Sequence, residues 1–253
     1  MKSWPAFAVV VAVQAIAQSP RELARLSVPL QPTQIGVILK GSREAIADRT
    51  FTLSFPDRDE GPQILMRGDG RPARMRTVYG ISGGTVGADG SGTQWHDDFV
   101  DVVDYTGAPA IRCDGSAIAG ELVITYQHRA STNAWTTAAA TTAVDWNGAP
   151  VQIGEPIFGI LSGTTPVSSA SVPQTRGGHL ARAFTAPFVG LAGRGLGDSP
   201  ASAMQSLWID VDSLLPVMWE VSVGSGPSYE LVFNYNPLDL SPPEAIEPPH
   251  CIP

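Results

Sequence analysis

The sequence predicts a mainly β fold, either a curved antiparallel sheet or an incomplete barrel, with one or two short helices. Several short segments alternate polar and apolar residues, which is typical of strands that bury one face. Clusters of Gly, Pro, Asp and Ser separate these segments where hairpin turns are needed. The hydrophobic content of 43% is ordinary for a globular protein, so a sizeable core can form.

Residues 1–17 are expected to be a signal peptide. Lys2 precedes an apolar run over residues 6–13, and Ala15 and Ala17 supply the small-residue pattern of a cleavage site. The apolar run is well short of the ~20 residues that a membrane-spanning helix needs. We therefore expect a periplasmic or extracellular protein with no transmembrane span after the leader is cleaved.

A short helix, a strand and a hairpin are expected first in the mature chain. Ser19 and Pro20 provide a helix start, with a capping residue followed by Pro at the first helical position. Residues 50–55 alternate as a half-buried strand does. Residues 63–66 and 74–79 flank a Gly-Asp-Gly turn and are predicted to pair as a hairpin.

Strands and loops are predicted to alternate through the middle of the chain. Residues 99–105 and 121–128 have strand composition. Residues 80–92 are rich in Gly, Ser, Thr and Asp and are predicted to form a flexible loop. The same reasoning predicts loops over residues 131–142 and the Gly-rich residues 190–199.

Three consecutive strands are predicted near the C-terminus, over residues 207–211, 217–221 and 229–235. Each keeps its large apolar residues in phase, while the opposite face is mixed and mostly polar. The pattern predicts an antiparallel meander with one apolar face, carrying Leu207, Ile209, Val217, Trp219, Val221, Leu231 and Phe233. Alternation of this kind indicates either a filled core or the wall of an apolar cavity.

A Pro-rich extended tail over residues 237–253 is expected to follow a single β-rich domain over residues 18–236. The tail contains Cys251, and Cys113 is the other cysteine of the chain. Two thiols alone do not complete a zinc site, so in an oxidising compartment we expect these residues to form a disulfide.

Charge and local motifs argue against several classes of function. Loss of Lys2 with the leader takes the net charge from −8 to −9, which disfavours nucleic acid as a partner. Ser82 lies in a G-x-S-x-G string, but the residues after it cannot form the helix that a nucleophile elbow requires. His96 and Asp97 would point to opposite faces of a strand, which disfavours a metal site. The run from Asp210 lacks the Gly and Glu of a calcium loop and is predicted to form a turn.

The C-terminal part resembles the LolA/LppX-like periplasmic lipoprotein-carrier superfamily over residues 148–236. The resemblance rests on a short helix at residues 156–161 and on a hairpin that runs from residues 207–212 through Leu215-Pro216 into residues 217–221. It implies an incomplete, strongly curved barrel covered by helices, with an apolar cavity for acyl chains. The implied cavity residues are Phe158, Leu161, Leu207, Ile209, Val217, Trp219, Val221, Leu231 and Phe233.

The leading hypothesis for function is an exported binding protein that holds a lipid or a lipoprotein acyl chain. The alternative is a non-catalytic envelope β module that acts by protein–protein contact with a partner that the sequence does not identify. A secreted hydrolase using Ser82 or His96 is the third hypothesis. We expect no enzymatic activity, no cofactor and no metal.

Overall fold

The computed structural model of this chain describes residues 18–56, 61–86, 92–142, 149–188, 203–224, 229–242 and 246–253. The predicted signal peptide at residues 1–17 and the Gly-rich segment at residues 190–199 lie outside these ranges. No helix in the described part of the chain is long and apolar enough to cross a membrane.

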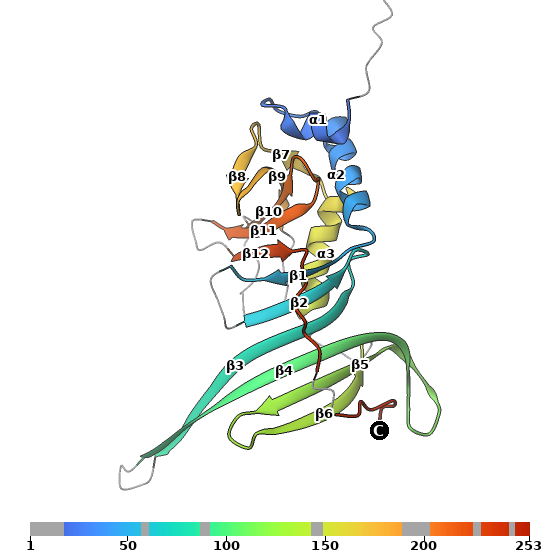
Figure 1. Cartoon of the computed structure of the whole chain (residues 1–253), viewed down its shortest axis with the longest axis vertical. Coiled ribbons are helices and arrows are strands. Elements are labelled where there is room, and N and C mark those ends of the chain that lie inside the picture. The colour runs from blue at the N-terminus through green and yellow to red at the C-terminus, as the bar shows by residue number, and fades with distance from the viewer. Residues whose placement is uncertain are drawn as a thin grey trace, which may run out of the picture.

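The chain is mainly β, as predicted, and its described strands form one open antiparallel sheet (Figure 1). Along the sheet the strand order is β6-β5-β4-β3-β2-β1-β12-β11-β10-β9-β7, and β8 also pairs with β9. The strands are β1 Thr50–Ser54, β2 Gly61–Arg67, β3 Pro72–Val86, β4 Gly92–Ile111, β5 Ala117–Arg129, β6 Ala134–Thr141, β7 Ser168–Ser169, β8 Gln174–Arg176, β9 His179–Pro187, β10 Ala203–Asp210, β11 Pro216–Val223 and β12 Tyr229–Asn234.

The prediction of a flexible loop over residues 80–92 was wrong for its described part. β3 and β4 stay paired from Arg74↔Asp104 to Val86↔Gly92. The glycines allow large side chains to lie across the strand, since a Cβ at Gly83 would come within 2.5 Å of the Trp95 ring. These glycines therefore permit close packing within a strand.

The prediction of a loop over residues 131–142 was wrong for residues 134–141, whereas residues 131–133 do form a turn. β6 pairs with β5 from Leu122↔Thr141 to Arg129↔Ala134. Small residues dominate β6, so the sequence lacks the apolar alternation of a strand, but the backbone of β5 offers it hydrogen-bond partners. The Trp135 ring lies 5.0 Å from that of His128 on β5.

The C-terminal strands form the predicted meander, and they join the N-terminal strands through the centre of the sheet. β12 pairs with β1, with Leu53 opposite Phe233. Leu207 is opposite Trp219 in the β10–β11 pair, and Trp219 is opposite Leu231 in the β11–β12 pair. The predicted phase of these three residues is thereby confirmed.

The described part of the chain contains three helices, α1 Pro20–Arg25, α2 Pro32–Ile46 and α3 Ala149–Ser162. Ser19 begins α1 with the predicted side-chain cap on the amide of Glu22. α2 was not predicted, although its buried residues Ile35, Ile38 and Leu39 follow helical spacing. α3 is longer than the predicted turn at residues 156–161. In Figure 1 the helices lie next to one another beside the C-terminal strands.

The tail passes β1 and β2 and ends near β6 (Figure 1). The predicted Cys113–Cys251 disulfide is present, with the two Cα atoms 5.0 Å apart. Ile246 and Ile252 of the tail pack on a buried cluster of the β4–β5 strands, made of Val102, Leu122, Ile124 and Tyr126. The tail therefore covers one face of the N-terminal strands.

Candidate functional site

The predicted apolar face lies between the helices and the C-terminal strands. Its residues Leu161, Leu207, Ile209, Trp219, Val221, Leu231 and Phe233 belong to one buried cluster, and Phe158 packs against that cluster from α3. The same cluster contains Ile35, Ile38 and Leu39 from α2 and Ile157 and Ile160 from α3. We refer to these residues together as the sheet–helix cluster.

Val217 is placed elsewhere. It belongs to a separate buried cluster with Trp208 and Met218. The register of β10 and β11 shifts from Trp208↔Met218 to Ile209↔Pro216, so Val217 is an extra residue with no partner of its own on β10. A bulge of this kind interrupts the alternation of faces, which explains why simple alternation misplaced Val217.

The strand residues of the sheet–helix cluster are covered on all sides. Leu207 and Ile209 are 0% exposed, and Phe233, the most exposed of the predicted strand residues in the cluster, is 7% exposed. An acyl chain could therefore contact these side chains only by displacing part of the helix layer. Whether the face lines a cavity stays a prediction.

One polar pair lies within this apolar surface. Trp219 Nε1 donates a hydrogen bond of 3.0 Å to Oε1 of the buried Gln205, whose Nε2 donates to the Pro187 carbonyl at 3.3 Å. The Phe188 ring meets Trp219 edge-on at 5.9 Å between centroids. These contacts hold the indole in one orientation, because the buried N–H needs its acceptor.

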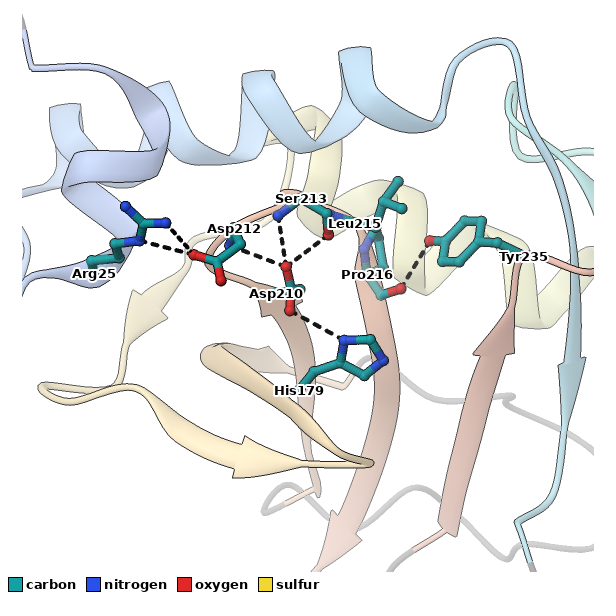
Figure 2. A network of polar contacts seen from close by, with 8 residues as sticks. All are labelled: Arg25, His179, Asp210, Asp212, Ser213, Leu215, Pro216 and Tyr235. Carbon is teal, nitrogen blue, oxygen red and sulfur yellow. Dashed lines mark hydrogen bonds and ion pairs between the residues drawn. The ribbon is translucent and has the colours of Figure 1, made fainter.

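Asp210 organises the turn between β10 and β11 (Figure 2). Its Oδ1 accepts hydrogen bonds from the amides of Asp212 and Ser213 and from the Ser213 hydroxyl, at 2.6–3.0 Å. Oδ2 lies 3.2 Å from His179 Nδ1. Burial alone would raise the pKa of Asp210, but these hydrogen bonds outweigh burial and lower the pKa below its ordinary value. The predicted turn at Asp210 is confirmed, with the carboxylate satisfying backbone amides.

The end of α1 is tied to this region by two arginines. Arg25 forms an ion pair with Asp212 (Figure 2). Arg182, on β9, is 0% exposed and donates to the carbonyl oxygens of Ala24, Leu26, Val28 and Ala170. Sequence reasoning missed Arg182, although a lone Arg within an apolar strand is a signal, since a buried guanidinium needs several acceptors.

Ser82, His96 and Asp98 form a row across β3 and β4. Ser82 is paired with His96 in the ladder, and a hydrogen bond of 2.7 Å joins Ser82 Oγ to His96 Nδ1. His96 Nε2 lies 2.8 Å from Asp98 Oδ1. The order matches that of a proton relay, but Ser82 lies inside a strand, and the side chains of His96 and Asp98 are more than half exposed. Sequence reasoning considered Ser82 and His96 separately and did not pair them.

Asp97 points away from that row, as the alternation of strand residues predicted. It is buried, and it accepts hydrogen bonds from Ser131 Oγ at 2.6 Å, from the Ser131 amide at 2.9 Å and from the Arg129 guanidinium. Hydrogen bonds from Ser131 and then from Arg129 lower the pKa of Asp97 to about 2. The carboxylate thus connects β4 to the turn between β5 and β6.

Metal ligands are not grouped in the part of the chain that the structure describes, where no three His, Cys, Asp or Glu residues are placed to share an ion. Comparison with models of known protein families and with curated proteins found no match to the chain.

Proposed function

We propose that the protein is an exported carrier that holds a lipid or lipoprotein acyl chain between its sheet and its helix layer. The observation that carries this proposal is the sheet–helix cluster, a continuous apolar layer between an open sheet and separate helices. An open antiparallel sheet with helices over one face also fits the resemblance to the LolA/LppX-like carriers. An acyl chain in this layer would keep its methylene groups away from water. Each buried CH₂ would contribute roughly 0.8 kcal/mol to the free energy of binding.

We propose α3 as the element that moves to admit the chain. Pro156 lies inside the helix, where it supplies no amide hydrogen and weakens the helix by about 3 kcal/mol. The side chains of Ile157, Ile160 and Leu161 hold α3 on the cluster. An acyl chain could replace these contacts, because its own contacts would also be apolar and non-directional.

The test is lipid binding by protein purified from the periplasm or medium with its disulfide intact. Native mass spectrometry should detect a copurified lipid, and titration with a fluorescent fatty acid should show saturable binding. Absence of both would contradict the carrier and favour the non-catalytic β module.

Two helix-stabilising substitutions sharpen this test. Pro156→Ala restores the amide to α3 and should raise stability while slowing fatty-acid uptake. Gly36→Ala is the matched control on α2, where a Cβ meets no other atom within 4 Å and should also raise stability. Equal uptake by the two variants would contradict the role of α3.

A further inference from the structure

The ends of β3 and β4 form a two-stranded ribbon that extends past the rest of the sheet. Among the described residues, the β2–β3 pairing ends at Val78 and the β4–β5 pairing ends at Phe99. We refer to residues 80–86 and 92–98 as the ribbon, and Figure 1 shows it projecting away from the other strands. Among the described residues no strand lies on the outer edge of β3 over residues 80–86.

The two edges of the ribbon differ in charge. The β4 side carries His96, Asp97 and Asp98, whereas residues 80–86 of β3 contain no charged residue and no Pro. Natural proteins usually protect free strand edges with charges, Pro or bulges, because an unprotected edge pairs with another strand. A two-stranded ribbon is also only marginally stable alone in water. The β3 edge therefore has the properties of a pairing surface.

We propose that residues 80–86 pair antiparallel with the same residues of a second copy of this chain, across a two-fold axis. The register that pairs the whole edge places Gly83 on the axis and Ile81 opposite Thr85 of the other copy. An uncharged segment can pair with itself without like-charge repulsion, which is not true of the β4 edge. The ribbon is about 23 Å long, so the acidic bodies of the two copies stay apart.

The exposed apolar side chains of the ribbon support this partner. Ile81 is 42% exposed and Trp95 is 49% exposed. The Trp95 ring lies over Gly83, at the proposed axis. A two-fold axis normal to the sheet keeps both Trp95 rings on one face, where each would cover apolar surface of the other copy. The inference does not depend on the carrier proposal, since the ribbon contributes nothing to the sheet–helix cluster.

The test is sedimentation velocity of the exported, full mature chain at concentrations from about 1 to 200 µM, a range suited to a small interface. We expect a reversible dimer. The double variant Ile81→Lys with Thr85→Lys puts positive charges at positions that face each other across the interface, at two places in each dimer. The repulsion should weaken dimerisation roughly tenfold or more. Ile81→Lys with Thr85→Asp places opposite charges there and should restore the dimer.

Val37→Lys is the matched control, because Val37 is 41% exposed but lies on α2. This variant should dimerise as the wild type does. A monomeric wild-type protein at every concentration would overturn the proposal, even if another protein bound the ribbon. A dimer that both double variants leave unchanged would also overturn it, by placing the interface elsewhere.

Discussion

Individual buried polar residues hold the helix layer against the sheet. Arg182 is the clearest case, because its guanidinium serves carbonyl oxygens at the end of α1, in the segment after α1 and before β8. Desolvation lowers the pKa of Arg182, and the carbonyl acceptors among the described residues compensate for its burial. A Lys cannot replace these contacts, since it lacks the planar set of five donors.

Arg182→Met is expected to destabilise the protein by at least about 3 kcal/mol, because each buried acceptor left without a donor costs about 1–3 kcal/mol. Arg182→Lys should recover only part of this loss. Urea unfolding followed by circular dichroism measures both values. Arg21→Met, at an exposed position of α1, is the control and should change stability little. Equal effects at the two positions would contradict the role given to Arg182.

Asp97 is expected to make stability depend on pH in the acid range. Its pKa is about 2 in the folded chain and about 3.9 in an unfolded chain. A lowered pKa means that the stabilisation is complete above about pH 4 and is lost as the pH falls towards 2. Asp97→Asn should therefore flatten the stability profile between these values, as measured by urea unfolding at each pH. Asp48→Asn removes an exposed carboxylate as a control, and an unchanged profile in Asp97→Asn would refute the assignment.

At the scale of elements, the tail is attached to the N-terminal strands at its very end. Beside the disulfide, the Ile252 amide donates to the Ile111 carbonyl at 2.9 Å, and the Cys113 amide donates to the Ile252 carbonyl at 3.0 Å. Ile252 and Ile246 then pack against the buried β4–β5 cluster that includes Val102 and Tyr126. The described part of the tail forms neither a helix nor a central strand, yet it thus becomes part of the apolar packing on the β4–β5 cluster.

Replacing both Cys113 and Cys251 by Ser should release the tail. The chain-entropy model limits the loss of stability to about 5 kcal/mol for a loop of 138 residues. The uncovered β4–β5 cluster should bind a hydrophobic dye, and hydrogen exchange should accelerate at residues 246–253. Ile252→Ala in the disulfide-bonded chain separates lost packing from the lost cross-link. Unchanged dye binding in the double variant would show that the tail stays in place without the bond.

At the scale of the whole molecule, the two halves of the chain share one sheet and one core. β1 from the first half pairs with β12 from the second, and the Phe51 and Phe233 rings lie 5.2 Å apart. α2 from the first half and α3 from the second contribute to the same sheet–helix cluster. Because both faces of this contact are apolar, neither half is expected to be stable alone.

Residues 18–142 and 143–253, expressed separately, should each fail to show a cooperative unfolding transition. Mixing them should restore the β-sheet signal in circular dichroism and a single transition. A cooperative transition in either fragment by itself would indicate two independent domains. Mixing with a second fragment that carries Phe233→Asp is the control, since it puts a charge into the shared core and should prevent recovery.

The sequence by itself determined the fold class, the C-terminal meander and the disulfide. Alternation at Leu207, Ile209, Trp219 and Leu231 reports burial of one face, which is a local property of a strand. The pairing of Cys113 with Cys251 followed from their being the two cysteines of a chain expected to enter an oxidising compartment. These features could be predicted because they depend on residue type and spacing alone.

Only the tertiary structure decided which residues share a surface. Val217 leaves the apolar face because of a register shift, and residues 80–86 form a strand because β4 lies beside them. The contacts of Arg182 with α1 and with the segment after it join residues more than 150 positions apart. Ser82 meets His96 because the hydrogen-bond ladder between β3 and β4 aligns them. The physical reason is that register, strand edges and buried polar contacts are set by distant partners, which periodicity within one segment does not encode.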